Sequence, residues 1–444
     1  MKHIKTKTLS LLFALVLILG LTATVPPTNI SKAAQRLVSI STPEEFRTFI
    51  SNVHAGRTYA GKIVALSQNI AFDHTVVNLD SSATGVFEGM LDGRGFSITG
   101  INMDGGDNAC LFNIGTKGEV RNLLITESYF TGTVDAAAIA DVNEGVIRNC
   151  IVHRNRIYGV RATAGLVCKN RGKVLNSACL DSTLKAEHPE SYEEGCGGIA
   201  MSNSGAIENC CNTSSLEVGG GVTSCGGIVA YMEDNPGALL NICYSMGKLN
   251  SQSKKGGIIG FFMNGVAQYC YCSEDMCKTI SGDISLGKEV ECTVMPGVTL
   301  LKPDFALALN TKIDPARTDL TGWNANPNLG AVIPGFPGQL DTLPPAGAPA
   351  FGAPKKVKAK CIRKGTIRVT WKKIKSADGY SVEVSYNKKF KKAQKHTAKT
   401  TKCVIKKLKK NKTVFVRVRG FVSDDDGPWY GKYSKAVKIK VKKK

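Results

Sequence analysis

A hexapeptide of the form G-x-[VI]-x-N recurs through the middle of the chain and restricts its fold more than any other feature. Copies and near copies are GEVRNL at Gly118, GVIRNC at Gly145, GKVLNS at Gly172, GAIENC at Gly205, GALLNI at Gly237 and GVAQYC at Gly265. Their glycines are 27, 27, 33, 32 and 28 positions apart. A second phrase alternates with the first, as AAIA, AGLV, GGIA, GGIV and GGII at positions 137, 164, 197, 226 and 256. Each repeat therefore contains at least two short apolar segments bounded by turns.

Repeats of this length and pattern predict a right-handed parallel β-solenoid. Leucine-rich repeats need a denser leucine frame, and tetratricopeptide or ankyrin repeats need helical periodicity over a dozen residues. In a solenoid each repeat is one coil, and equivalent residues stack ~4.8 Å apart along the axis. The repeat asparagines are then predicted to form one structural ladder of amides bonded from coil to coil, with members Asn122, Asn149, Asn176, Asn209 and Asn241.

The cysteines are spread one or two per coil, which favours packing inside a narrow solenoid. Counted from the repeat glycine, Cys150, Cys210 and Cys270 are at +5, and Cys211 and Cys243 are at +6. Ladder neighbours lie within disulfide reach, so bridges Cys211/Cys243 and Cys196/Cys225 remain an alternative. Fifteen cysteines is an odd number, so at least one thiol is free or pairs between chains.

The sequence contains no clear motif for a zinc site or for a metallopeptidase active site. The set Cys270, Cys272, Cys277 and Cys292 lacks the paired C-x2-C spacing of zinc sites. The six histidines are scattered, and no H-E-x-x-H occurs. We therefore predict no metal, no cofactor and no catalytic residue.

The ends of the chain differ in character from the repeats. Residues 1–33 combine early lysines, an apolar run and Ser31-Lys32-Ala33, the pattern of a cleaved export signal. The apolar run is too short for a transmembrane segment, and no second such run follows. Residues 341–354 are a Pro/Gly-rich linker. Residues 355–444 hold 27 lysines and 4 arginines against 5 acidic residues, a balance of +26 within a total of +22. The remainder of the chain is slightly acidic.

Residues 37–340 resemble bacterial surface proteins with GLUG-motif repeats. The most specific stretch is FEGMLDGRGFSITGI from Phe87 to Ile101, preceded by STPEEFRTFISNV from Ser41. Thr42-x-x-Glu45 is a plausible capping box for a helix that covers the first coil. FALALN at Phe305, with Trp323 and GFPGQL, is similar to the closing cap of that family. The resemblance implies a capped parallel β-helix.

Residues 355–444 are similar to a lysine-rich fibronectin type III domain, an immunoglobulin-like β-sandwich. Trp371 matches the core tryptophan of the second strand, and Leu408 with Val416 and Val418 matches the family's leucine and V-x-V strand. A fold with this charge attracts polyanions. The expected binding face comprises Lys372, Lys373, Lys388, Lys389, Lys391, Lys392, Lys406, Lys407, Lys409 and Lys410.

Two functions of different classes follow. The first is an exported, non-enzymatic protein of the cell surface or wall, in which the basic domain contacts an anionic wall polymer or glycan, and the solenoid engages a host or neighbouring-cell surface protein. A dedicated nucleic-acid site is not expected, because few aromatic residues interleave with the lysines. The alternative is a polysaccharide lyase or glycosidase, with carboxylates among Asp73, Asp80, Asp92, Asp104 and Asp107. That reading rests on fold analogy.

Overall fold

The computed structural model describes residues 37–444 except 73–84, 192, 220–222, 252–253, 327, 339, 341–352, 375–376, 425–426, 431–432 and 443–444. The predicted export signal, most of the predicted linker, Asp73 and Asp80 lie outside the described residues. Within the described residues, no helix is long and apolar enough to cross a membrane. The described chain is all-β apart from two helices, α3 (Pro43–His54) and α4 (Pro303–Asn310).

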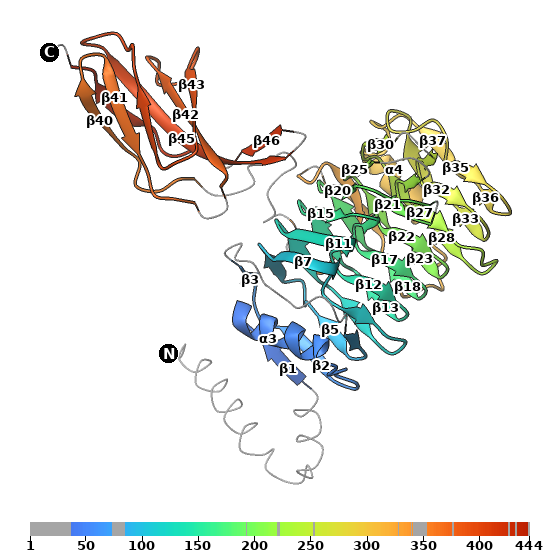
Figure 1. Ribbon diagram of the computed structural model, residues 1–444. Helices are drawn as coiled ribbons and strands as arrows, with labels where there is room; N and C mark the ends of the chain where they lie inside the picture. The colour runs from blue at the N-terminus through green and yellow to red at the C-terminus, as the bar shows by residue number, and fades with distance from the viewer. Residues whose placement is uncertain are drawn as a thin grey trace, which may run out of the picture.

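Four parallel sheets form a solenoid-like stack (Figure 1), as the repeat predicted. Sheet A contains β1 (Leu37–Ile40), β2 (Ile63–Leu66), β5 (Met90–Asp92), β9 (Glu119–Arg121), β13 (Val146–Arg148), β18 (Lys173–Leu175), β23 (Ala206–Glu208), β28 (Leu239–Asn241), β33 (Val266–Gln268) and β36 (Lys288–Val290). Sheet B contains β3 (Ile70–Ala71), β6 (Ser97–Thr99), β10 (Leu124–Thr126), β14 (Ile151–His153), β19 (Ala178–Leu180), β24 (Cys211–Asn212), β29 (Tyr244–Ser245), β34 (Tyr271–Ser273) and β37 (Thr293–Met295).

The other two sheets complete each coil. Sheet C contains β30 (Leu249–Ser251), β25 (Ser215–Val218), β20 (Thr183–Ala186), β15 (Arg156–Gly159), β11 (Tyr129–Ala137), β16 (Ala162–Ala164), β21 (Gly195–Gly197), β26 (Ser224–Gly226) and β31 (Lys254–Gly256), with β7 (Asn102–Ala109) paired to β11. Sheet D contains β35 (Ser281–Ile284), β32 (Ile259–Phe262), β27 (Val229–Met232), β22 (Ala200–Asn203), β17 (Val167–Asn170), β12 (Ala140–Asn143), β8 (Asn113–Ile114) and β4 (Val86–Phe87).

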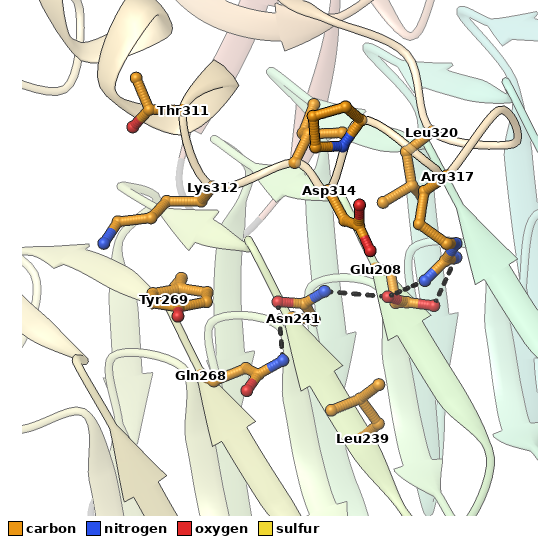
Figure 2. Close-up of a pocket in the computed structure, with 12 residues that line it drawn as sticks. Glu208, Leu239, Asn241, Gln268, Tyr269, Thr311, Lys312, Asp314, Arg317 and Leu320 are labelled. Carbon is orange, nitrogen blue, oxygen red and sulfur yellow. Dashed lines mark hydrogen bonds and ion pairs between the residues drawn. The ribbon is translucent and has the colours of Figure 1, made fainter.

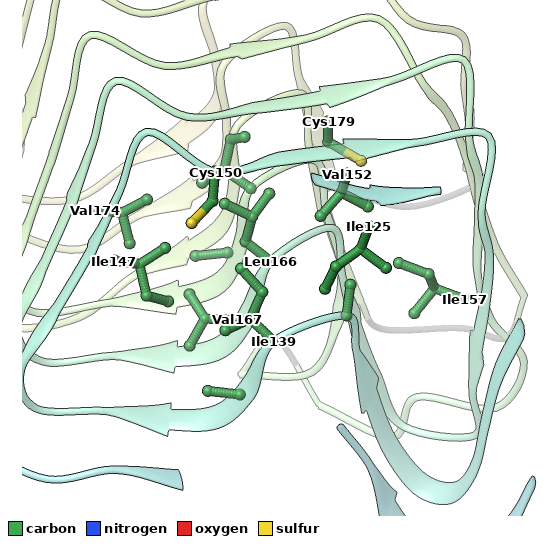
Figure 3. Packing of buried hydrophobic residues seen from close by; sticks show 14 of the residues in the cluster. Ile125, Ile139, Ile147, Cys150, Val152, Ile157, Leu166, Val167, Val174 and Cys179 are labelled. Atoms are coloured by element: carbon green, nitrogen blue, oxygen red, sulfur yellow. The ribbon is translucent and has the colours of Figure 1, made fainter. Parts of the chain in front are cut away.

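The apolar position of the repeat points into the core. Val120, Ile147, Val174 and Ile207 pair in register along sheet A, and none of them is exposed to solvent. Ile125 and Val152 do the same in sheet B, and Figure 3 shows these residues converging on one interior. Each coil thus buries side chains that a single repeat cannot bury alone, which makes stacking the source of stability.

Helix α3 covers the first coils, as expected from the sequence. Thr42 and Glu45 form the predicted capping box. The ring of Phe49 packs edge-on against Phe87 and Phe112, at centroid distances of 5.6 and 5.9 Å. This aromatic cluster seals the core at its N-terminal end, where the apolar surface would otherwise face water.

Residues 300–340, the C-terminal strap, contain the segment predicted to be the closing cap. The strap consists of α4 and the hairpin of β38 (Trp323–Asn326) with β39 (Ala331–Pro334). It packs on the outer face of sheet B, where it forms a second apolar cluster with Leu124, Ile151 and Tyr244. The Tyr244 hydroxyl donates to Val332 O at 2.6 Å and accepts from Val332 N at 3.0 Å. The strap therefore lies along the coils and ties several of them together.

The C-terminal β region is antiparallel and packs two sheets on one core. One sheet contains β40 (Lys358–Arg363), β41 (Thr366–Thr370) and β44 (Lys402–Ile405). The other contains β43 (Gln394–Ala398), β42 (Gly379–Ser385), β45 (Thr413–Asp424), β46 (Gly427–Tyr430) and β47 (Val437–Lys440). Trp371, Leu408, Val416 and Val418 are buried together in this core, as their predicted roles require.

Candidate functional site

The predicted asparagine ladder exists over four coils. Asn149, Asn176 and Asn209 each donate an amide N–H to the preceding asparagine, with distances of 3.0, 3.0 and 2.8 Å. All four asparagines, Asn122 included, follow a sheet A strand and have positive φ, between 49° and 59°. Asparagine tolerates this left-handed conformation better than most residues, which explains why it recurs at the corner.

Asn241 was wrongly assigned to the ladder. It pairs in register with Glu208 and donates to Glu208 Oε2 at 2.9 Å, while Ile242 takes the left-handed corner position. The turn at 233–238 adds residues before β28, so Ala238 and not Gly237 is equivalent to Gly205. Counting from the repeat glycine therefore misplaced this coil by one residue.

The same shift corrects one cysteine pair. Cys211 pairs with Tyr244, so Cys243 lies in the column of Cys210 and not beside Cys211. Cys196 does lie beside Cys225, as predicted. All fifteen cysteines are free thiols in the structure, and most are buried, consistent with the predicted packing role.

The buried thiols have a repeated structural task. Cys150, Cys210, Cys243 and Cys270 each donate to the carbonyl two residues earlier, at 3.2 to 3.4 Å, and Ser177 does so at 2.8 Å. Each of these carbonyls also accepts a backbone N–H from the preceding coil, so the thiol or hydroxyl fills its second acceptor position at the buried corner. Burial raises the pKa of the Cys150 thiol to about 12, so that it stays protonated. In the described ranges, no group of three or more His, Cys, Asp or Glu side chains is arranged to hold a metal ion.

The ten predicted binding lysines are all exposed, but they do not form one face. Lys372 and Lys373 follow β41, at the end of the sheet where Thr370 pairs with Lys402. The other eight are in the turns 386–393 and 406–412, which lie at the opposite end because Ser385 pairs with Phe415 at the start of β45. Lys372 and Lys373 therefore drop out of the predicted face.

Three turns join at that opposite end, here called the basic pole. Lys409 N donates to the Tyr386 hydroxyl at 2.7 Å, and Leu408 N donates to Gly365 O at 2.9 Å, which links the turns 363–365, 386–393 and 406–412. Their exposed basic residues are Arg363, Lys364, Lys388, Lys389, Lys391, Lys392, Lys406, Lys407, Lys409, Lys410 and Lys412, and the three turns contain no acidic residue.

An internal ion pair anchors the basic pole to the core of the C-terminal region. Arg417 Nε donates to Glu383 Oε2 at 2.8 Å, and the guanidinium lies 4.2 Å from the ring centroid of Phe390, in the turn 386–393. Burial acts to raise the pKa of Glu383, but hydrogen bonds from Tyr433 and Arg417 hold it below its usual range. The contact between Arg417 and Phe390 therefore holds the turn 386–393 against β45.

A pocket of about 530 Å³ lies between sheet A and the strap (Figure 2). Glu208, Asn241 and Gln268 come from three successive strands of sheet A, and Lys312, Asp314 and Arg317 come from the strap. Gln268 donates to Asn241 at 3.2 Å, and Arg317 forms two hydrogen bonds to Glu208, at 2.9 and 3.1 Å. The sequence gave no signal for this pocket, because Glu208 and Arg317 are 109 residues apart and belong to no shared motif.

Two carboxylates meet on the other side of the coil. Lys169 Nζ lies 3.1 Å from Asp135 Oδ2 and 3.8 Å from Asp141 Oδ1, and both carboxylates are almost buried. Burial raises the pKa of Asp141, Lys169 opposes that shift, and Asp135 adds to it. Of the aspartates predicted for an enzyme, Asp92 instead binds Arg121 and Arg94 N in a turn, and Asp104 and Asp107 are exposed.

Comparison with known proteins finds likeness only to solved structures. No family model and no curated protein matches the chain. The chain is similar to the FN5 domain of Drosophila Lar, with 22% identity over 20% of this chain and 96% of that one, and a TM-score of 0.18. It is similar to the FN1–FN3 domains of chicken CNTN1, with 24% identity over 20% of this chain and 32% of that one, and to the fn3 domain of human contactin 1, with 18% identity over 21% and 80%. Both have a TM-score of 0.18.

Proposed function

We propose that this protein is an exported, non-enzymatic binding protein of the cell surface or wall, and that its basic pole contacts an anionic wall polymer or glycan. The observation that carries the proposal is the joining of three turns with eleven basic and no acidic side chains. Such a concentration of one charge attracts flexible polyanions and holds them without a shaped pocket. In this proposal the solenoid is the displayed part, which engages a host or neighbouring-cell protein.

The proposal includes the finer fold and family assignments. The repeat pattern supports a right-handed solenoid of the GLUG-motif type, and the buried Trp371, Leu408, Val416 and Val418 support a fibronectin type III sandwich. The leader pattern at residues 1–33 supports export.

Co-sedimentation with purified Gram-positive cell walls tests the proposal. The full chain should sediment with walls at low salt, lose binding as salt rises, and bind less after the teichoic acids are removed. Salt-independent sedimentation, or equal binding to stripped walls, would contradict the electrostatic contact.

A second candidate, a polysaccharide-cleaving enzyme, is favoured by Asp135 and Asp141. A nearly buried carboxyl with a raised pKa, beside a second carboxylate and Lys169, has the properties of a general acid. The test is release of reducing ends from wall polysaccharides. An enzyme would lose this activity in Asp141→Asn, whereas a binding protein would show none above background in either form.

A further inference from the structure

We propose that the pocket between sheet A and the strap binds a neutral sugar ring, the end or side group of a glycan. This inference does not depend on the basic pole. The pocket volume, about 530 Å³, falls within the ~300–1,000 Å³ typical of small-molecule sites. It is formed only when the strap crosses the coils, so the solenoid and strap build it together (Figure 2).

The two cations in the walls of the pocket, Lys312 and Arg317, are already paired with carboxylates. Arg317 binds Glu208 in two hydrogen bonds, and it also binds Asp319 through Nε at 2.7 Å. Lys312 Nζ lies 2.7 Å from Glu291 Oε2. An anionic ligand would have to break one of these pairs to gain a cation, and leaving a nearly buried Glu208 without its partner is costly. The pocket therefore disfavours an anionic ligand, and the Asp314 carboxylate remains available to accept a hydrogen bond from a ligand.

The remaining polar groups suit hydroxyls. Asn241 uses its amide to accept from Gln268 and donate to Glu208, which orients both amides at the pocket floor. The Asp314 carboxylate faces that floor from the strap, and Oδ1 accepts only from Ala316 N among the described contacts. In the same described contacts, Gln268 Oε1 has no donor. A hydroxyl can donate to a carboxylate or amide oxygen and also accept from an amide N–H, so a ring with several hydroxyls matches this arrangement.

Apolar surface completes the match. Leu239, Ile313 and Leu320 line the pocket beside the half-buried ring of Tyr269. Lys312 Nζ lies over one face of that ring, 4.4 Å from its centroid. A sugar ring carries C–H groups on its faces as well as hydroxyls at its rim, so it contacts both kinds of lining. Tyr269 has a φ of 51° because it occupies the left-handed corner position that Asn209 and Ile242 hold in earlier coils, so the coil geometry determines where its ring lies.

Calorimetric titration of the full chain with glucose, galactose, mannose and N-acetylglucosamine tests the proposal. Gln268→Met removes the amide with little change of shape, and Asp314→Asn replaces the carboxylate but keeps an oxygen for Ala316 N. We expect at least one sugar to bind the native protein, and each variant to bind it about tenfold more weakly, as expected for a lost hydrogen bond to a ligand.

Asp304→Asn, an exposed change on α4, is the matched control and should bind as the native protein does. Circular dichroism melting confirms that each variant is folded. The proposal is overturned if none of the four sugars binds the native protein, or if Gln268→Met or Asp314→Asn binds the sugar as tightly as the native protein does. A variant with both Lys388 and Lys389 changed to Gln should keep sugar binding, so the failure of this site and of the basic pole are distinguishable.

Discussion

Asn176 accepts a hydrogen bond from the backbone N–H of Thr321, 145 residues later in the chain, at 3.0 Å. The same side chain donates to Asp319 O at 2.7 Å and continues the ladder to Asn149 and Asn209. Its amide therefore makes four contacts, two within the solenoid and two with the strap. The ladder stabilises the corner and also positions the strap that roofs the pocket.

Loss of the strap contacts should be measurable at Asn176. Asn176→Gly keeps a residue that accepts positive φ but removes all four hydrogen bonds, whereas Asn149→Gly removes only ladder bonds. At about 1 kcal/mol per hydrogen bond, urea unfolding should show Asn176→Gly to be the less stable variant by roughly 2 kcal/mol. Equal losses would mean that the strap contacts add no stability.

The ion pair under the pocket should be costly to break from one side. The Glu208 side chain is 5% exposed, so Arg317→Met leaves a carboxylate buried without its partner. We expect a loss of about 3 kcal/mol in the free energy of unfolding. Adding Glu208→Gln removes the stranded charge and should recover part of that loss. A double variant no more stable than Arg317→Met would show that buried charge is not the cause.

His153 should make the protein sensitive to acid. Burial, with Arg154 nearby, lowers the pKa of His153 from 6.5 to about 3. The unfolded chain binds a proton below pH 6.5 that the folded chain does not, so stability falls as the pH drops from about 6.5 toward 3. This one group accounts for up to roughly 5 kcal/mol.

His153→Gln should therefore flatten the fall in stability between pH 6.5 and 4, compared with the native protein in urea titrations at each pH. Parallel pH profiles for the two proteins would show that His153 is not buried in its neutral form.

Thiol labelling under native conditions should distinguish the half-buried cysteines from the fully buried ones. Cys292 and Cys361 are half-buried, and a hydrogen bond with Cys270 lowers the pKa of Cys292. Burial raises the pKa of Cys179 and Cys225 to about 12. A thiolate-specific reagent should modify Cys292 and Cys361 first and the buried thiols only on unfolding. Early modification of Cys179 would contradict the packed core.

The repeat predicted the coils because side-chain period and turn residues are local properties. It failed at Asn241, since the longer turn at 233–238 moves the glycine without moving the strand, and only pairing with Glu208 reveals the register. The net charge of the C-terminal region was readable from composition, but the separation of Lys372 from Lys388 depends on which strand ends meet. The pocket was unpredictable for a related reason, because Arg317 reaches Glu208 across 109 residues.

The claim that the basic pole contacts an anionic polymer is tested most directly by comparing two double variants of equal charge. Lys388→Gln with Lys389→Gln alters the basic pole, and Lys372→Gln with Lys373→Gln alters the opposite end. Affinity of the full chain for heparin, used as a defined polyanion, is measured across a salt series. We predict weaker binding and a salt dependence shallower by roughly one per lost contact for the pole variant only. Equal losses in both variants would show that binding follows net charge and not the pole, and would contradict the account.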